Sequence, residues 1–204
     1  MGFYSERIFP WIMDHTDTSE LREERRRAVA EACGDVLEIG VGTGANFPHY
    51  GTGVRSVTAL EPSAGMNRRA RRNLGKTGVP IRPVAGDAQQ LPFRNHVFDV
   101  AVAVLVLCTV SDAERALAEM RRVLAPGGRL HFLEHVRAPD PSVERWQRRL
   151  QPLWRRMACG CELTRDTEDR ITGAGFEIEV IDRFWLPNAP RFLGCMIRGR
   201  AIAA

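Results

Sequence analysis

The sequence predicts a single-domain, doubly wound α/β fold built on a seven-stranded sheet. Apolar runs of strand length alternate with amphipathic stretches of helix length, the pattern of successive strand–helix–strand units. The run "VFDVAVAVLVL" (97–107) is apolar at almost every position, as expected for a central strand of a parallel sheet covered on both faces. With 204 residues, 44% of them hydrophobic, the chain is long enough for one substantial core. Residues 1–204 are therefore expected to form one domain.

Local signals place the individual elements. Strands are predicted over residues 35–40, 56–62, 81–87, 97–107, 129–136, 176–184 and 191–202. Helices are predicted from about Asn46, over 63–78 with Ser63 as N-cap, and over 111–128, and the segment 167–175 is predicted to be the end of a further helix. The connection over 184–190 carries no helical pattern, so the last two strands are expected to pair antiparallel. Residues 1–30 are expected to form a helical lid, and residues 137–166 an insertion on the substrate side.

Charge and hydropathy argue against two classes of protein. The net charge is +4, and the densest arginine clusters, 22–27 and 67–72, lie on predicted helices without interleaved aromatic residues. They are expected to be solvated helix faces and not a nucleic-acid surface. No apolar run reaches the ~20 residues needed to cross a bilayer, and the N-terminus lacks the regions of a signal peptide. A cytoplasmic protein is therefore expected.

The five cysteines are odd in number and scattered, which does not suit a disulfide framework. Cys159 and Cys161 form a C-x-C pair, but no second pair and no neighbouring histidine completes a zinc site. The cysteines are predicted to be free thiols, and no metal site is predicted.

Three glycines follow the first predicted strand within five positions. Gly40, Gly42 and Gly44 let the backbone approach a ligand, and a helix beginning near Asn46 would offer free N–H groups. Glu61 ends the second strand, where an acidic side chain can accept hydrogen bonds from both hydroxyls of a ribose. Because ligands of doubly wound folds bind at the carboxyl ends of the strands, these residues predict an adenosine-containing cofactor.

Two cofactor classes use such a turn. "GVGTGA" satisfies the G-x-G-x-x-[GA] pattern of dinucleotide-binding proteins, whereas "EIGVGTG" resembles the first motif of class I S-adenosylmethionine-dependent methyltransferases, E/D-x-G-x-G-x-G. The resemblance implies that Glu38 helps to hold the methionine end of the cofactor through the loop. A pyrophosphate would be repelled by Glu38, which weighs against a dehydrogenase.

Three further segments resemble the same family and occur in its order: "AGDAQQLPF" (85–93), "FDVAVAVLVL" (98–107) and "RVLAPGGRLHFLEHV" (122–136). The family has a Rossmann-like seven-stranded sheet with an antiparallel last strand, as the strand pattern here also predicts. Its members convert S-adenosylmethionine to S-adenosylhomocysteine.

The resemblance also implies a set of cofactor contacts. Asp87 would bond the adenine amino group, and Ala88 the ring edge through its backbone. The chain at Val104 and Leu105, at the end of the fourth strand, would lie close to the amino group of the methionine moiety. Phe3 and Tyr4 are candidates to close over the cofactor as part of the lid, and a helix docked on the edge of the sheet is the alternative for this segment. The remaining implied contacts are Asn46, Pro62 and Met66, in addition to Glu61 and the three glycines.

The segments after the fourth strand narrow the choice of methyl acceptor. "LVLCTV" (105–110) lacks both the Asn/Asp-Pro-Pro-aromatic motif of amino-directed enzymes and the Pro-Cys nucleophile of RNA C5 enzymes, so Cys108 is expected to be a small wall residue. Together with "WQRRLQPLWRRMACGCELTRDT" (146–167) it resembles the methyltransferase-like, UbiE-related thiol S-methyltransferases, by W-x(7)-W and G-C-x-L-T-R. The resemblance implies a small-molecule thiol as acceptor. The membrane-bound animal members begin with a hydrophobic anchor that this sequence lacks, so a soluble relative is expected.

Methylation of a thiol needs little machinery, because a thiol of pKa ~8.5 is already a few per cent thiolate at neutral pH. His135 is the candidate catalytic base, and a bond to a neighbouring loop is its alternative role. Arg165 is a candidate for stabilising a thiolate, with an ion pair to Asp166 or Glu168 as the alternative. The predicted substrate pocket comprises Cys108, Trp146, Trp154, Cys161 and Arg165, and plain helix packing is the alternative for the tryptophans.

The predicted function is therefore S-adenosylmethionine-dependent methylation of a small thiol by a monomer or homodimer. Methylation of oxygen, nitrogen or carbon in another small molecule, such as a quinone precursor or phospholipid headgroup, is the alternative within the same fold. A non-catalytic sensor that binds S-adenosylmethionine is the alternative from a different class.

Overall fold

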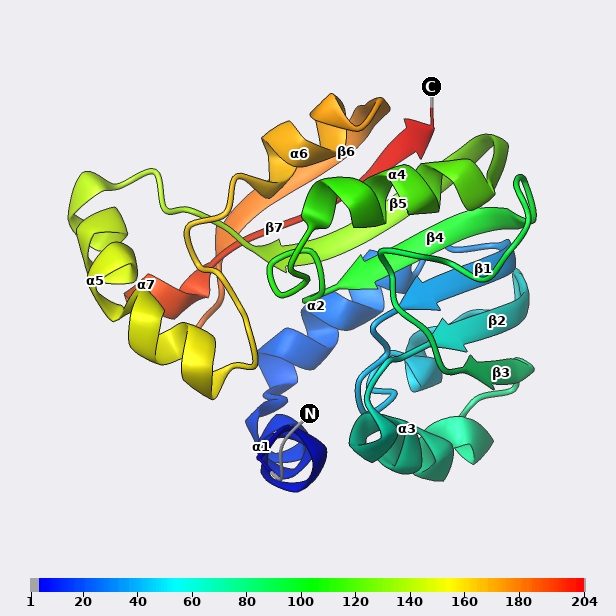
Figure 1. Cartoon of the computed structure of the whole chain (residues 1–204), viewed down its shortest axis with the longest axis horizontal. Coiled ribbons are helices and arrows are strands. Elements are labelled where there is room, and N and C mark those ends of the chain that lie inside the picture. Colours follow the sequence, from blue (N-terminus) through cyan, green and yellow to red (C-terminus); the bar gives the residue numbers. More distant parts are fainter. Residues whose placement is uncertain (1–3, 204) are drawn as a thin grey trace.

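A computed structural model describes residues 4–203, which fold around one sheet (Figure 1). The strand order is β3-β2-β1-β4-β5-β7-β6. The strands are β1 (Gly34–Ile39), β2 (Val54–Leu60), β3 (Ile81–Val84), β4 (Phe98–Val104), β5 (Leu124–His135), β6 (Phe176–Trp185) and β7 (Cys195–Ala203). The first five strands pair in parallel, and β7 pairs antiparallel with both β5 and β6. The predicted seven-stranded, doubly wound sheet with an antiparallel last strand is confirmed.

The helices cover both faces of the sheet and one of its edges. They are the π-helical turn η1 (Tyr4–Ile8), α1 (Phe9–Thr16), α2 (Ser19–Val29), the 3₁₀ helices η2 (Phe47–His49) and η3 (Arg71–Lys76), α3 (Ala64–Ala70), α4 (Ala113–Val123), α5 (Pro141–Met157), α6 (Thr167–Gly173) and α7 (Arg191–Gly194). Among residues 4–203, no helix combines the length and the apolar composition needed to cross a membrane.

Alternate residues of the central strands face two separate cores, as the pleat of a strand requires. Leu37 and Ala101 pack in the core that includes Leu117 of α4, whereas Val36 and Val100 pack in the core on the side of α2. This burial on both faces explains why the central strands have almost continuous apolar sequences.

The structure corrects the helix that was predicted to start near Asn46. That segment forms only the short helix η2, and no α-helix stands between β1 and β2. Pro48 inside the segment has no N–H to donate, and Gly51 and Gly53 follow within a few residues, so the turn cannot propagate. The glycine turn is therefore followed by a compact loop.

Several other predicted boundaries are too long. The helix predicted over 63–78 is α-helical only to Ala70, although Ser63 caps it as expected by accepting the N–H of Met66. The helix over 111–128 ends at Val123, because the chain is extended from Leu124 onward. The strand predicted over 97–107 stops at Val104, since Leu105 adopts a left-handed conformation with φ of 60°.

Two strand predictions are also shortened by local turns. The strand predicted over 81–87 ends at Val84. Asp87 lies in the following turn, where its backbone pairs with that of Gln90. The segment 191–202 begins with the helical turn α7 before β7 starts. Neither change alters the order of the strands.

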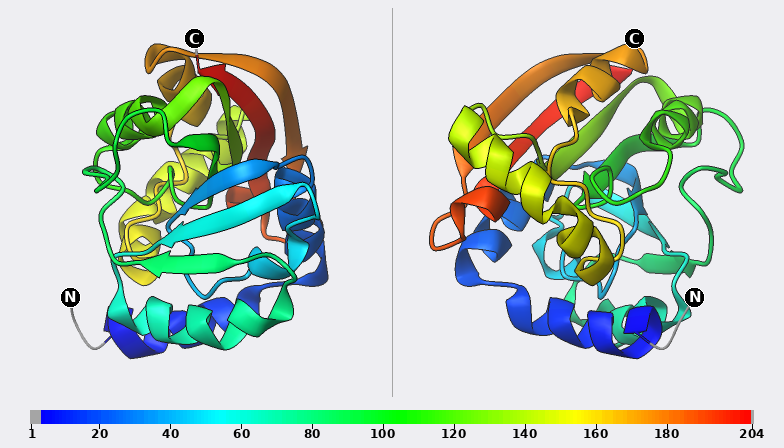
Figure 2. Two further views of the ribbon diagram at one scale, coloured as in Figure 1. Left: turned by 90° about the vertical axis from the view of Figure 1, so that its right-hand side faces the viewer. Right: turned by 60° about the vertical axis from the view of Figure 1, so that its left-hand side comes forward.

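The N-terminal helices and the insertion flank the carboxyl ends of the parallel strands. η1 and α1 run alongside α3 in both views of Figure 2, and η1 contacts α3. The insertion over 137–166 contains α5, which packs against α7 on the other side of the same strand ends. The ends of β1, β2, β4 and β5 are thus enclosed between two helical segments.

Candidate active site

A cavity of 460 Å³ lies at the carboxyl ends of β1, β2 and β4. Larger cavities lie elsewhere, one of 580 Å³ at the amino ends of β1 and β4 and one of 550 Å³ between β6, β7 and the start of α6. Only the first occupies the position at which doubly wound folds bind their ligands. Its lining includes the predicted cofactor residues Gly40, Gly42, Glu61, Pro62, Met66, Asp87, Ala88, Val104 and Leu105.

The three glycines of the turn all adopt left-handed conformations, with φ of 59° at Gly40, 56° at Gly42 and 77° at Gly44. A Cβ on Gly40 would stand 2.5 Å from Val106, and one on Gly44 would stand 2.6 Å from the ring of Phe47. Side chains are thus excluded by conformation at all three positions and by packing at two of them. The backbone of the turn therefore forms the floor of the cavity.

Glu61 is buried, with 6% of its surface exposed, and both of its carboxylate oxygens are oriented by backbone N–H groups. Oε2 accepts the N–H of Gly42 at 2.9 Å, and Oε1 accepts that of Ser63 at 2.9 Å. Burial raises the pKa of Glu61, an effect opposed by these two hydrogen bonds and reinforced by the nearby charge of Glu6. Each oxygen keeps lone pairs for a further donor, as a pair of ribose hydroxyls would require.

Glu38 does not line the cavity but fixes the loop that does. Its oxygens accept hydrogen bonds from Nδ2 of Asn46 at 2.8 Å and from the Tyr50 hydroxyl at 2.7 Å. The side chain is fully buried, and burial raises the pKa of Glu38 to about 7. The residue thus holds the glycine turn indirectly, through the loop.

The substitution Glu38→Gln is expected to flatten the pH dependence of stability. Between the unfolded pKa of about 4.3 and the folded value of about 7, the folded chain keeps a proton on Glu38 that the unfolded chain has lost. Stability should therefore fall as pH rises through this window, by up to roughly 1.4 kcal/mol per pH unit from this group. Glutamine removes that contribution.

Urea unfolding of both proteins at several pH values measures the difference in slope. Glu61 has a pKa raised in the same direction but is present in both proteins, so its contribution cancels. Parallel pH profiles for the two proteins would contradict the assignment.

Arg25 joins this network from α2, and sequence reasoning missed it. Its guanidinium donates to Oδ1 of Asp17 at 3.1 Å and to Oδ1 of Asn46 at 3.2 Å, and both Arg25 and Asp17 line the cavity. The prediction that the cluster 22–27 is a solvated helix face is therefore wrong for Arg25, which is 6% exposed, and for Glu24, which is 9% exposed. All six residues of the cluster are charged, so composition alone does not show that Arg25 is buried against Asp17.

The opposite end of the cavity holds the predicted adenine residues. The Asp87 carboxylate accepts hydrogen bonds from the backbone and side-chain N–H groups of Gln89, at 2.9 and 3.0 Å. The amide oxygen of Gln89 in turn accepts the Ser111 hydroxyl at 2.9 Å, which ties the turn after β3 to the start of α4. Ala88 and Met66 are buried along the cavity wall.

The N-terminal segment covers the cavity, with Phe9, Met13 and Asp17 in its lining. Glu6 docks the segment by accepting the N–H of Gly65 at 2.5 Å and the Ser63 hydroxyl at 3.2 Å. A Cβ at Gly65 would lie 2.1 Å from the Glu6 carbonyl oxygen, so this close approach requires glycine.

Tyr4 does not line the cavity. Its hydroxyl donates to the Met157 carbonyl at 2.6 Å and so joins the N-terminal segment to the end of α5. Phe3, the other residue predicted to close the lid, lies outside the described residues.

Glu134 anchors the loop after β4 and is the second residue that sequence reasoning missed. It is completely buried, and its carboxylate accepts the N–H groups of Val106 at 2.9 Å, Leu107 at 2.8 Å and Cys108 at 3.0 Å. Burial raises the pKa of Glu134, and the three hydrogen bonds oppose that effect. An acidic residue next to the apolar residues Phe132 and Leu133 of a predicted strand was the available signal.

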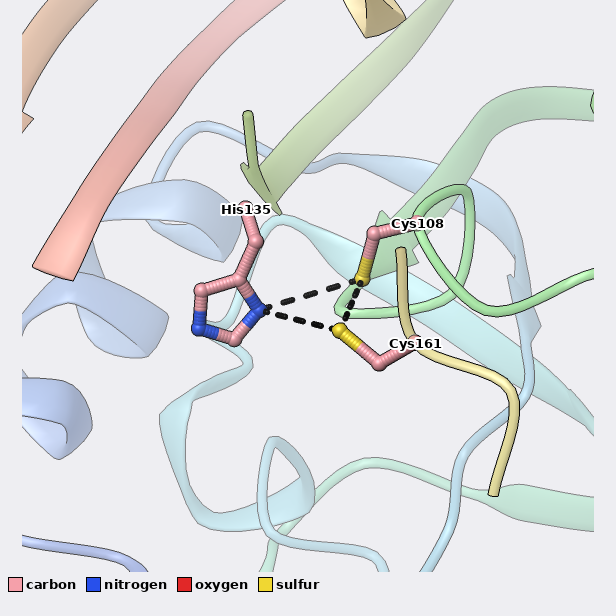
Figure 3. A group of neighbouring side chains, drawn as sticks. All are labelled: Cys108, His135 and Cys161. Carbon is pink, nitrogen blue, oxygen red and sulfur yellow. Dashed lines mark hydrogen bonds between the residues drawn. The ribbon is translucent and has the colours of Figure 1, made fainter. Parts of the chain in front are cut away.

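Cys108, His135 and Cys161 converge from three separate segments beside the cavity (Figure 3). Nδ1 of His135 lies 3.9 Å from Sγ of Cys108 and 3.7 Å from Sγ of Cys161, and the two sulfur atoms are 3.6 Å apart. Cys108 precedes Thr109, and Cys161 follows two residues after Cys159; both neighbours line the cavity. The sequence analysis considered only ligands close to the C-x-C pair in the chain and so missed this group.

The other predicted pocket residues have different environments. Trp154 packs against Cys108 and Cys161, and its buried indole N–H has no hydrogen-bond partner among the described residues. Trp146 is 56% exposed on α5, with Arg149 over its ring, and does not reach the cluster or the cavity.

Arg165 is buried and links the segment after α5 to the loop after β4. Its guanidinium pairs with Glu162 at 2.8 Å and donates to the carbonyls of Leu107 at 2.5 Å and Val110 at 2.7 Å. The predicted alternative pairing with Asp166 or Glu168 is wrong: those carboxylates pair with Arg137 and Arg183. Arg165 thus fixes the loop after β4 from the side opposite Glu134.

The fold and the site define a class of protein, and comparisons with known proteins agree with it. A family model described as "Methyltransferase domain" matches residues 37–132. The chain is 37% identical over 175 residues to thiol S-methyltransferase TMT1B of Homo sapiens, covering 80% of this chain and 70% of that protein. It therefore belongs to the class I S-adenosylmethionine-dependent methyltransferases.

The chain is also similar to a methyltransferase named for a different acceptor and to solved structures of the same fold. Phosphatidylethanolamine N-methyltransferase of Cereibacter sphaeroides is 36% identical over 129 residues, covering 59% of this chain and 63% of that protein. The N-methyltransferase NodS of Bradyrhizobium japonicum, solved with S-adenosyl-L-homocysteine, superposes with a TM-score of 0.69 at 20% identity, covering 93% of this chain and 90% of that chain. The last comparison supports the fold alone.

The residues around the cavity fit S-adenosylmethionine. Glu61 presents two oriented acceptors, which suits a ribose, and Ala88 and Met66 offer an apolar wall, which suits an adenine. Arg25 and Asp17 place one charge of each sign at the other end, which suits the carboxylate and ammonium of a methionine moiety. When bound, the cofactor supplies an electrophilic methyl carbon.

Proposed function

We propose that this S-adenosylmethionine-dependent methyltransferase acts on a small-molecule thiol. The observation that carries the proposal is the group of Cys108, His135 and Cys161, which lies next to residues of the cavity wall. This group offers sulfur and imidazole atoms, which stabilise a thiolate or take up its proton. The thiol acceptor of the TMT1B relative supports the same assignment.

In this proposal, the protein positions the acceptor and excludes water, and needs no strong base. Glu61, Asp87 and the glycine turn hold the cofactor, while Glu38 and Glu134 keep the two surrounding loops rigid. His135 takes up the proton of the acceptor thiol and so favours its thiolate form. The N-terminal segment, docked by Glu6, closes over the cavity and keeps water from the reacting atoms.

A panel of acceptors tests the proposal. The purified chain is incubated with S-adenosylmethionine and, separately, with a small alkyl thiol, an aryl thiol, a phenol, a hydroquinone, a primary amine and phosphatidylethanolamine vesicles. We expect S-adenosylhomocysteine and the methyl thioether to form in equal amounts with thiols. Intact-mass measurement of the protein excludes methylation of its own cysteines, and Trp146→Ala, on the exposed side of α5, is the matched control that should keep full turnover.

The other outcomes assign the alternatives. Turnover of the phenol, the hydroquinone, the amine or the lipid without any methyl thioether would overturn the thiol assignment. Tight binding of S-adenosylhomocysteine with no turnover of any acceptor would instead support a sensor.

A further inference from the structure

The geometry of the cysteine–histidine cluster matches a metal site with three protein ligands. In a tetrahedral zinc site with Zn–S bonds of about 2.3 Å and Zn–N bonds of about 2.0 to 2.1 Å, two sulfurs lie about 3.8 Å apart and a sulfur lies about 3.6 Å from a nitrogen. The observed separations are 3.6 Å between the sulfurs and 3.9 and 3.7 Å from the sulfurs to Nδ1 of His135. The three atoms therefore need only small shifts to coordinate one ion (Figure 3).

The two cysteines are held in place by hydrogen bonds to the backbone around them, which orient metal ligands. Glu134 accepts the N–H of Cys108, and the Cys108 carbonyl accepts the N–H of Glu162 at 2.7 Å. The Gln151 amide donates to the Cys161 carbonyl at 2.9 Å and accepts the N–H of Leu163 at 2.7 Å. The loop after β4, the segment after α5 and α5 itself are thus joined through the backbone of the two cysteines.

The number of ligands indicates the kind of site. Among residues 4–203, no other histidine, cysteine or carboxylate joins the three in this group. Zinc sites with two cysteines and one histidine are known in enzymes that keep the fourth position for a substrate, whereas structural zinc sites have four protein ligands. The adjacent cavity, lined by Thr109 and Cys159, is where a methyl acceptor has to enter.

We propose that Cys108, His135 and Cys161 bind one Zn²⁺ ion and leave its fourth position to the sulfur of the acceptor thiol. This inference rests on the proposed function and makes His135 a ligand in place of a base. A thiol that coordinates zinc is deprotonated outright, and its proton passes to solvent. Methyl transfer then forms the sulfur–carbon bond of the thioether, breaks the methyl–sulfonium bond and leaves that electron pair on the sulfur of S-adenosylhomocysteine.

Metal binding is tested first, without turnover. The full chain, reduced with a phosphine and stripped with a chelator, is titrated with Zn²⁺ in competition with a chromophoric chelator, and with Co²⁺ for its spectrum. We expect one ion per chain, with thiolate-to-cobalt charge transfer and the visible bands of tetrahedral Co²⁺. Cys108→Ser, Cys161→Ser and His135→Ala should each weaken binding at least about 100-fold, since even outer hydrogen-bond partners of ligands cost 10- to 100-fold.

Two control variants test whether zinc binding depends on the cluster and not on the other cysteines of the chain. Cys33→Ser changes an exposed cysteine and Cys195→Ser a buried one outside the cluster, and both should keep full zinc affinity. Retained binding of S-adenosylhomocysteine shows that each cluster variant is folded. Absence of stoichiometric zinc binding in the reduced chain, or binding that survives in the cluster variants, overturns the inference.

The role of the fourth position is tested with the acceptor. Adding a small thiol to the cobalt-loaded chain should increase the charge-transfer absorption, and removing the metal should lower thiol methylation at least about tenfold. Equal methylation by the metal-free chain would overturn the inference and leave the proposed function standing. Metal binding in a chain that methylates no thiol would overturn the proposed function instead.

Discussion

Replacing Glu61 by alanine is expected to weaken the binding of S-adenosylhomocysteine by about 100-fold or more. Hydrogen bonds to a charged group contribute about 1.5 to 3 kcal/mol each, and Glu61 is placed to accept two from one ribose. The backbone N–H groups of Gly42 and Ser63 also lose their acceptor, which loosens the glycine turn. Calorimetric titration of both proteins measures the effect.

An analogue of S-adenosylhomocysteine without the ribose hydroxyls separates the two causes. The wild-type protein should bind this analogue much more weakly than the parent compound, whereas Glu61→Ala should hardly distinguish them. Glu177→Ala, an exposed acid on β6, is the matched control and should bind as the wild type does. Unchanged affinity in Glu61→Ala would show that the ribose lies elsewhere.

Replacing Glu134 by alanine is expected to reduce the free energy of unfolding by about 3 to 5 kcal/mol. The change leaves three N–H groups without an acceptor; those of Leu107 and Cys108 are buried, and each buried group costs about 1 to 3 kcal/mol. Glu134→Gln should cost less, because its amide oxygen still accepts two of the N–H groups while its NH₂ faces that of Cys108. Denaturant unfolding checks the order of the three proteins.

The same substitution has a local consequence that distinguishes it from a general loss of stability. Hydrogen exchange of Val106, Leu107 and Cys108 should accelerate more than that of the strand interior under native conditions. Glu177→Ala again serves as the control for stability. A free energy of unfolding for Glu134→Ala within about 1 kcal/mol of the wild-type value would contradict the anchoring role, because a typical surface change costs no more than that.

The sheet could be predicted from the sequence because its information is local and periodic. An almost continuous apolar run marked β4, shorter apolar segments marked β1 and β2, and the Ser63 cap marked the start of α3. The missing helix after the glycine turn was predicted wrongly for an equally local reason, since Pro48 overrides a pattern that otherwise permits a helix.

The cofactor side of the site was accessible from sequence because its residues follow strand ends. Gly40, Glu61 and Leu105 each come directly after a parallel strand, so the fold alone brings them to one edge of the sheet. Arg25 and Glu134 could not be assigned in this way. Burial of a charge depends on which partners the tertiary structure supplies: Arg25 contacts Asp17 and Asn46, 8 and 21 positions away, and Glu134 accepts from N–H groups 26 or more positions away.

The acceptor side was the least accessible for the same reason. Cys108 and Cys161 are 53 positions apart, and His135 comes from a third segment, so no spacing in the chain reveals the cluster. Arg165 pairs with Glu162, which is as close in sequence as Glu168, so proximity in the chain did not select the partner. Its long-range contacts are the carbonyls of Leu107 and Val110, which hold the guanidinium on the side of Glu162.

A crystal structure of the protein with S-adenosylhomocysteine would show which residues hold the cofactor. We expect both ribose hydroxyls on the Glu61 carboxylate, the adenine against Ala88 and Met66, and the cofactor sulfur on the side of the cavity that faces Cys108, His135 and Cys161. A cofactor bound outside this cavity, or one whose sulfur points away from those three residues, would contradict this expectation.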